Sequence, residues 1–312
     1  MENVKSMTPE QLKAFKKAQK EEKKANKIPN IFNLIWKEIY NSKFAFGSLI
    51  MMVLLLVIPL IWSLFIDQTD ALRIVLGRND FSPAQFGPLG TDPGGRSMLN
   101  LLILAARNSF IIAFGITIGT SLIGYTVGLL AGFYGGFVDL LIMRIIDVLL
   151  MIPFIMVVIV VSAVFASSTG IGQFMLIIIA FGWFGTAIQF RARVLQESAK
   201  DYVLASKTLG TPNIVIMFRK VLPNVVSFMM VGLVLGLAFN IGIEAGLSFL
   251  GFGLPTGTPS IGHMIAFARN PDVLRLRPWQ WAPAVVLIVI MTMSIRGVGN
   301  AVSRAVNPKQ RR

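Results

Sequence analysis

The sequence contains no cysteine and only one histidine, His263, among its 312 residues. Without cysteine there can be no disulfide framework and no thiolate metal site. One histidine excludes a metal centre built from several imidazoles. The sequence also lacks any Gly-Lys dipeptide, and therefore the Gly-x-x-x-x-Gly-Lys-Ser/Thr loop that cradles nucleotide phosphates. We expect no catalytic residues, no metal and no cofactor in this chain.

Charged residues are also scarce, at 14% of the chain against roughly 25% in a soluble domain. Hydrophobic residues make up 54% of the sequence. They fall in runs near 20 residues, which is about the length of a helix that crosses ~30 Å of hydrocarbon. The composition therefore predicts an all-α integral membrane protein.

Six runs are candidates for transmembrane helices. They cover residues 44–66, 110–133, 140–166, 171–190, 225–250 and 282–295. The last run is short, and we expect it to continue past Arg296, whose long side chain can reach the interface. These runs divide the chain into an N-terminal segment (1–43), a first span (44–66), a loop (67–108), a five-helix core (109–302) and a basic tail (303–312).

The lysine and arginine residues are unevenly distributed along the chain. Residues 1–43 hold 10 of them and residues 191–224 hold 6, whereas the loops 67–108 and 251–281 hold 4 and 3. Alternate segments carry 22 on one side of the membrane and 7 on the other. The positive-inside rule therefore places both termini and residues 191–224 in the cytoplasm. The net charge of +14 then reflects topology and attraction to lipid headgroups, and we expect no nucleic acid partner.

Two short helices are predicted outside the spans. The first lies at residues 31–44, where Ile31, Leu34, Ile35 and Ile39 share one face. A helix with such a face just before a span is expected to lie in the membrane interface. The second is predicted in the outer loop, where Asp92-Pro93 has the composition of a helix start and the helix would run through Leu104.

Charged residues inside or beside the third span are candidates for a gate. Arg144 and Asp147 are three residues apart on one helical face and can pair, and Asp139 lies just outside the span. A lone charge at mid-bilayer costs about 2.5–3.5 kcal/mol on insertion scales, but these three groups lie near the cytoplasmic end, where the cost is lower. The pattern leaves open structural pairing or a role in gating.

The fifth span contains two further polar residues, Asn240 and Glu244. Glu244 must face protein or water rather than lipid. It could line a translocation path, bind a cation or pair with an arginine elsewhere in the chain. Because no relay of further acidic residues accompanies it, proton coupling is only weakly indicated.

Small residues recur every four positions in the second and fifth spans. They are Gly115 and Gly119, then Gly124, Gly128, Gly132 and Gly136, then Gly232 and Gly236, and Gly242 and Gly246. Such stripes let helix backbones approach closely. They could pack within this chain, against a second membrane subunit, or both.

Residues 191–224, called the hairpin here, form a polar segment between the fourth and fifth spans. The pattern predicts a helix over 191–209, a break at Gly210, a cap at Thr211-Pro212, a second helix to Leu222 and Pro223 before the fifth span. A capped pair of basic helices outside the membrane would form a rigid protrusion. Rigid elements transmit motion as units, so a cytoplasmic protein is the expected partner.

The hairpin resembles a motif of permease subunits of ABC importers. That motif is Glu-Ala-Ala, three residues, Gly, and a Leu-Pro pair about a dozen residues later. Here the register gives Leu204-Ala205-Ser206, then Gly210, then Leu222-Pro223. The spacing matches, although Leu204 replaces the glutamate, which leaves any salt bridge of that glutamate unassigned.

Three other stretches are similar to permeases of the oligopeptide/dipeptide type, in particular the C-type member of the permease pair. They are GPLGTDPGGRSMLNLLILAARNS, AGFYGGFVDLLIMRIIDVLLMIPF and EAGLSFLGFGLPTGTPSIGHM. With the hairpin, the resemblance covers roughly residues 30–308. It implies a type I ABC importer permease fold of six transmembrane helices with a cytoplasmic coupling helix, in a bacterial cell membrane.

The resemblance further implies a set of partners for peptide import. A second, homologous permease subunit would complete the pore, two cytoplasmic ATPase subunits would bind ATP and Mg, and an extracytoplasmic peptide-binding protein would deliver the peptide to the loops 67–108 and 251–281. It also implies ATPase-coupling residues, which are Leu204, Ala205, Ser206, Gly210, Thr211, Leu222 and Pro223. The pore or gate candidates remain Asp139, Arg144, Asp147, Asn240 and Glu244.

Other functions are compatible with parts of the sequence. The same scaffold could import another solute, such as nickel or a glycoside. A self-contained ion-coupled transporter would need inverted repeats and broken midplane helices, and no repeat between the halves is evident. A membrane scaffold without transport would leave the hairpin and Glu244 without a role.

Overall fold

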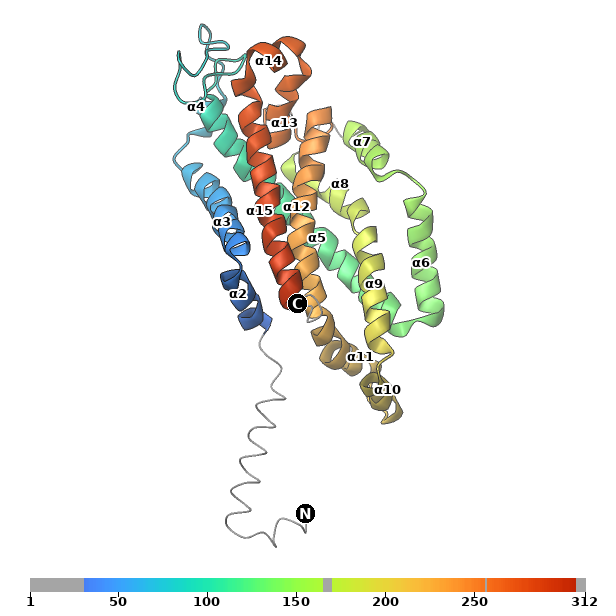
Figure 1. The fold of residues 1–312 in the computed structure, drawn as a ribbon. Coiled ribbons are helices and arrows are strands. Elements are labelled where there is room, and N and C mark those ends of the chain that lie inside the picture. The colour runs from blue at the N-terminus through green and yellow to red at the C-terminus, as the bar shows by residue number, and fades with distance from the viewer. Residues whose placement is uncertain (1–30, 165–169, 256, 307–312) are drawn as a thin grey trace, which may run out of the picture.

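The computed structural model describes residues 31–164, 170–255 and 257–306, and within them every regular element is a helix (Figure 1). Four helical stretches are long and apolar enough to cross a membrane: α3 (Lys43–Trp62), α5 (Met98–Tyr134), the stretch Asn213–Leu250 and α15 (Ala282–Val306). Two bent pairs add α6 (Gly136–Leu150) with α7 (Phe154–Val164), and α8 (Ile171–Gly182) with α9 (Phe184–Ser198). If each pair is counted as one span, the six predicted spans are confirmed.

The two bends divide spans that the hydrophobic pattern predicts as single helices. The α6–α7 pair bends by 71° at Met151–Pro153, and the α8–α9 pair bends by 43° next to Trp183. A proline cannot donate the backbone hydrogen bond of a continuing helix, so Pro153 explains the sharper bend. Hydropathy alone does not register such a break because the flanking residues stay apolar.

The helix α5 lies at the centre of the fold, with α9 on one side and α12 (Leu222–Leu250) on the other (Figure 1). Its glycines permit the close approach of α9. An added Cβ at Gly128 would lie 2.6 Å from the Ala187 carbonyl oxygen, and one at Gly132 would lie 2.7 Å from the carbonyl oxygen of Arg191. This part of the small-residue stripe therefore packs inside the chain.

The glycines of the fifth span are used differently. Gly232 faces the Tyr125 hydroxyl, and Gly236 lies near Thr117, both across the α5–α12 contact. Gly242 and Gly246 are exposed, and an added Cβ at either would meet no atom within 4 Å. That end of α12 therefore presents an open small-residue face.

At the N-terminal end, α2 (Ile31–Asn41) packs on α15. Ile35 and Ile39 are buried there, and the Arg304 guanidinium donates to the Glu38 carboxylate at 3.1 Å. The apolar face that we expected to lie on lipid therefore packs on protein. Residues 1–30, the rest of the N-terminal segment, and residues 307–312 of the tail lie outside the described residues.

The outer region differs from the sequence prediction at the start of the second span. The helix α5 begins at Met98, so residues up to Leu104 belong to its first turns and not to a separate short helix. The fully buried Asp92 carboxylate accepts from the backbone N–H groups of Gly94 and Arg96 and pairs with the Arg96 guanidinium. Asp92 therefore closes a turn before the helix instead of capping it.

The remaining outer helices are short: α4 (Gln68–Leu72), α13 (Ile261–Ala266) and α14 (Pro271–Leu276). The helix α13 is largely buried against α5, α12 and α15. It carries His263, which is half-buried with its Nδ1 at 3.1 Å from the Thr258 carbonyl oxygen. The buried neighbours Ile261 and Met264 hold the residue against the bundle.

Candidate functional site

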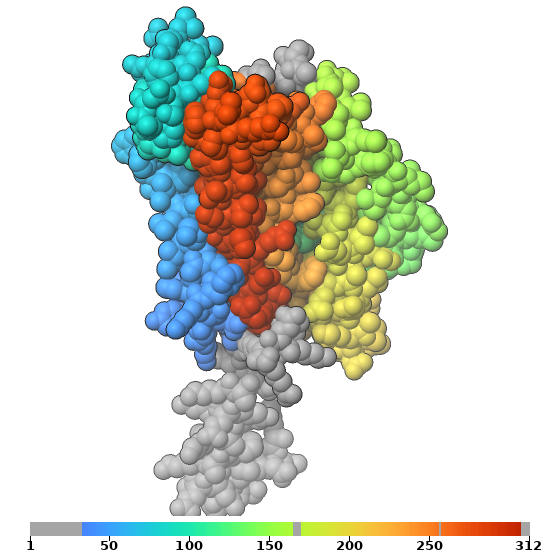
Figure 2. Space-filling model, turned by 45° about the horizontal axis from the view of Figure 1, so that its top comes forward, coloured from blue at the N-terminus to red at the C-terminus, as the bar shows by residue number. Residues whose placement is uncertain are grey.

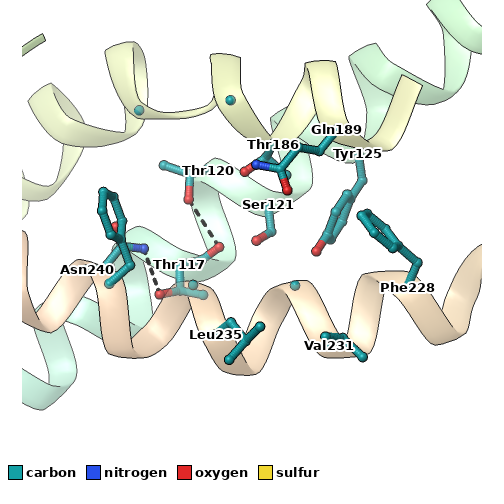
Figure 3. Close-up of a pocket in the computed structure, with 15 residues that line it drawn as sticks. Thr117, Thr120, Ser121, Tyr125, Thr186, Gln189, Phe228, Val231, Leu235 and Asn240 are labelled. Atoms are coloured by element: carbon teal, nitrogen blue, oxygen red, sulfur yellow. Dashed lines mark hydrogen bonds between the residues drawn. The ribbon is translucent and has the colours of Figure 1, made fainter. Parts of the chain in front are cut away.

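A polar groove lies in the membrane-spanning part of the fold, with a floor formed by α5 and walls formed by α9 and α12 (Figure 3). Its volume is about 460 Å³. The polar side chains that line it are Thr117, Thr120, Ser121, Tyr125, Thr186, Gln189 and Asn240. No lysine, arginine, histidine, aspartate or glutamate is among the lining residues. Figure 2 shows the corresponding recess between the orange α12 and the yellow α9.

Hydrogen bonds fix several polar groups of the groove to the helices. The Thr117 hydroxyl donates to the Ala113 carbonyl oxygen at 2.6 Å, and the Asn240 amide donates to the same hydroxyl at 2.9 Å. The Tyr125 hydroxyl donates to the Met229 carbonyl oxygen at 2.9 Å. These bonds join α5 to α12 and hold the groove's floor and one wall in register.

The opposite wall carries polar groups that are free to meet a solute. Neither Thr186 nor Gln189 makes a side-chain hydrogen bond within the part of the chain that the structure describes. Gly185, on the same wall, is exposed and has no atom within 4 Å of an added Cβ. The wall therefore combines open space with unpaired hydroxyl and amide groups.

An apolar cavity of about 300 Å³ adjoins the groove beneath the α6–α7 bend. The two share Gly182, Gly185, Phe239 and Asn240 as lining residues. The combination of a mostly apolar hollow and a few polar groups is typical of sites that hold small organic molecules.

Of the five pore or gate candidates, only Asn240 lines the groove. Asp139, at the start of α6, forms a bidentate pair with Arg191 of α9. Arg144 and Asp147 lie 3.8 Å apart, with 75% and 54% of their side chains exposed. Charged side chains in spans rarely face lipid, so this exposed pair makes the face of α6 a candidate for contact with another protein or with water.

Glu244 is fully buried and lies away from the groove. One of its carboxylate oxygens accepts from the Ser248 hydroxyl at 2.8 Å. Nearby, the Ser109 hydroxyl accepts from the backbone N–H of Ile261, and Asn108 donates to the carbonyl oxygen of Pro259. Glu244 thus sits where α5, α12 and the outer helix α13 meet.

The hairpin begins with two helices where the sequence predicts one. The helix α9 ends at Ser198, and α10 (Asp201–Thr208) begins after a break at Ala199–Lys200. Lys200 is in an extended conformation (ψ 149°), which stops α9 and redirects the chain. Propensity does not reveal this break because Ala199 and Lys200 are themselves good helix formers.

The turn of the hairpin is built on Gly210. Its φ of +74° is left-handed, which ends the helix at the predicted break, and the Thr211 N–H donates to the Ser206 carbonyl oxygen at 3.1 Å. Thr211 makes no capping bond to the second helix, however, and α11 (Asn213–Ile216) starts after Pro212, which is in an extended conformation. The predicted Thr211 cap is therefore wrong.

The second helix of the hairpin continues into the fifth span without a stop. A π turn at Met217–Val221 joins α11 to α12, and Leu222 and Pro223 form the first turn of α12. A π turn admits the extra residue and relieves the backbone around a proline, so Pro223 is accommodated inside a continuous helical stretch.

The tip of the hairpin exposes large apolar side chains. The exposed fractions are 48% for Leu204, 84% for Leu209, 59% for Ile214 and 52% for Phe218. Ala205 and Gly210 are also exposed, whereas Ser206, Thr211 and Leu222 are half-buried. An apolar patch on a polar segment is typical of a protein-binding surface.

Most residues of the groove and of the exposed patch on the hairpin were not among the site residues predicted from the sequence. Thr117, Thr120 and Ser121 recur at helical spacing within an apolar span, and Gln189 interrupts the fourth span, so polar residues inside the spans were the available signal. The exposure of Leu209, Ile214 and Phe218 had no comparable signal, because it depends on how the two helices pack.

Comparison with known proteins gives a consistent result. Residues 124–312 match a family described as the inner membrane component of binding-protein-dependent transport systems. The chain is 40% identical over 293 residues to the oligopeptide transport system permease protein OppC of Lactococcus lactis subsp. cremoris (strain SK11), covering 93% of this chain and 98% of that protein.

More distant relatives include two further permeases. The dipeptide transport system permease protein DppC of Bacillus subtilis (strain 168) is 30% identical over 277 residues, which cover 89% of this chain and 85% of that protein. The peptidoglycan transport system permease protein YejE of Agrobacterium fabrum is 34% identical over 224 residues, covering 71% of this chain and 57% of that protein.

Proposed function

The chain belongs to the family of inner membrane components of binding-protein-dependent transport systems, and we propose that it is the permease subunit of an ATP-driven importer of oligopeptides or dipeptides. The extensive match to an oligopeptide permease over nearly the full length of both chains carries this conclusion. Because the sequence has no phosphate-binding loop, ATP and Mg would be bound by partner ATPase subunits.

The polar groove is our candidate for this chain's share of the translocation path. Peptides vary in side-chain charge but always carry backbone amides. A groove with hydroxyl and amide groups and no charged side chain can hydrogen-bond a peptide backbone without selecting for charge. Selection among peptides would then lie with the extracytoplasmic binding protein.

A second, homologous permease subunit would close the open side of the groove. The exposed Gly242 and Gly246 on α12 would let a helix of that subunit approach closely. The exposed Arg144 and Asp147 on α6 would face the second subunit or the water-filled path.

The hairpin is our candidate for the contact with the ATPase subunits. Its exposed apolar patch, formed by Leu204, Leu209, Ile214 and Phe218, would be covered by an ATPase. Ala205, Ser206 and Gly210 would lie in that interface, while Leu222 and Pro223 join the hairpin to the fifth span. Both termini and the hairpin would then be cytoplasmic.

The proposal is tested by reconstituting the chain with its partner subunits in vesicles and measuring uptake of labelled peptide. We expect uptake to require ATP. Replacing Gly185 with leucine should reduce uptake severalfold, because the new side chain enters the groove from a position with no obstructing atom. The matched control is Gly172→Leu, at an equally open glycine outside the groove, which should transport normally. Uptake by this subunit alone, driven by a proton gradient, would contradict the proposal.

A further inference from the structure

The hydroxyl of Tyr202 lies where the three parts of the hairpin region meet. Tyr202 itself belongs to α10, and its hydroxyl is 2.7 Å from a carboxylate oxygen of Glu197, at the end of α9. The side-chain amide of Asn224, in the first turn of α12, donates to the same hydroxyl at 3.0 Å. One phenol oxygen therefore joins the end of the fourth span, the helix α10 and the start of the fifth span.

The Glu197 side of this junction is a buried, charge-assisted site. Glu197 is only 4% exposed, and its two carboxylate oxygens accept from the Lys200 ammonium at 2.9 and 2.7 Å. Partial burial and the neighbouring carboxylate raise the pKa of Tyr202 to about 12, so its hydroxyl stays protonated at physiological pH. The phenol can therefore donate to Glu197 across the helix break that follows α9.

The Asn224 side of the junction compensates for an interrupted backbone. The π turn changes the hydrogen-bond pattern before α12, and Pro223 contributes no N–H group. Asn224 donates its side-chain amide both to Tyr202 and to the Lys220 carbonyl oxygen, the latter at 2.7 Å. Both N–H groups of the Asn224 side-chain amide are thereby hydrogen-bonded, at the point where the π turn and Pro223 interrupt the regular helical hydrogen bonds.

We propose that Tyr202 is a positioning residue that makes α9, α10 and the start of α12 move as one body when the hairpin is displaced. The inference rests on the proposed function, in which the hairpin receives motion from an ATPase. A second contact ties α10 to the central helix: the Lys207 ammonium lies 5.1 Å from the centre of the Phe133 ring. Without the Tyr202 hydroxyl, α10 would keep that contact and the apolar packing of Val203, but it would lose its hydrogen-bonded link to both spans.

The test is Tyr202→Phe in the complete transporter, with Tyr134→Phe as the matched control. Tyr134 is 46% exposed and its hydroxyl makes no hydrogen bond within the described residues. For Tyr202→Phe we expect the ATPase subunits to stay bound and ATP hydrolysis to continue, while peptide taken up per ATP falls about fivefold or more, the lower range of couplings between sites. Tyr134→Phe should match the unmodified transporter.

A pair of variants at Glu197 separates positioning from simple folding. Glu197→Gln keeps an acceptor for the Tyr202 hydroxyl and should retain more uptake per ATP than Glu197→Ala, which removes it. Equal uptake per ATP in the two Glu197 variants would overturn the inference. Unchanged uptake per ATP in Tyr202→Phe, or loss of the ATPase subunits from the Tyr202→Phe transporter, would also overturn it.

A further variant, Gly210→Val, distinguishes failure of this inference from failure of the proposed function. If Gly210→Val uncouples ATP hydrolysis from uptake while Tyr202→Phe does not, only this inference fails. If neither variant uncouples them, the proposed function of the hairpin fails.

Discussion

At the scale of single residues, Gly210 determines the shape of the hairpin. Its left-handed φ of +74° turns the chain between α10 and α11, and no atom lies within 4 Å of the position that a Cβ would take. The constraint at this position is therefore the backbone conformation and not the available space. A left-handed conformation costs most residues about 1–2 kcal/mol, and asparagine less than others.

Gly210→Val is therefore expected to uncouple ATP hydrolysis from uptake, whereas Gly210→Asn should keep most of the coupling. A β-branched residue strains the turn and displaces the exposed patch that follows it. The measurement is peptide uptake and ATP hydrolysis by the reconstituted transporter carrying each variant. Equal coupling in the valine and asparagine variants would show that the turn does not position the hairpin.

At the scale of elements, the packing of α5 on α9 fixes one wall of the groove against its floor. The glycines at 124, 128 and 132 bring the two helices close enough for backbone atoms to limit any larger residue. The hydrogen bonds of Tyr125 and Asn240 hold the other wall, α12, against α5. The width of the groove is therefore set by close helix packing on the α9 side and by hydrogen bonds of its own lining residues on the α12 side.

Gly128→Ala is expected to destabilise the chain by about 1–3 kcal/mol, because the new methyl group would overpack the α5–α9 contact. Gly246→Ala, at an open position on α12, should be neutral or stabilising, since alanine favours helix more than glycine does. Thermal unfolding of both variants in detergent compares them directly. If both alanines have the same effect on the unfolding temperature, α5 and α9 are not in close contact at Gly128.

Much of this arrangement could be predicted from the sequence, and the limits have physical causes. The spans follow from the length of apolar runs, and the left-handed turn at Gly210 follows from the one residue type that adopts it freely. The Ala199–Lys200 break, the π turn before Leu222 and the burial of the α2 face on α15 depend on tertiary contacts. Among the five gate candidates, spacing indicated the Arg144–Asp147 pair but not the partner of Asp139, which is 52 residues away.

At the scale of the whole molecule, continuous helices connect an uncharged groove in the membrane to an apolar patch on a basic hairpin. The two helices that form the walls of the groove, α9 and α12, also continue into the hairpin. A displacement of the hairpin would therefore be passed directly to two walls of the path. An ATPase can move the walls of the groove through this connection only if the hairpin lies on the side of the membrane where ATP is available.

The sidedness of the hairpin is the most direct test of this account, and the natural absence of cysteine makes the measurement simple. Asn213→Cys places a thiol on the exposed start of α11, and Ala84→Cys places a control thiol on the exposed outer loop. With a membrane-impermeant maleimide, intact cells should label only the Ala84 variant. Inverted vesicles should label the Asn213 variant, and bound ATPase subunits should protect it. Labelling of the Asn213 variant in intact cells would contradict the account.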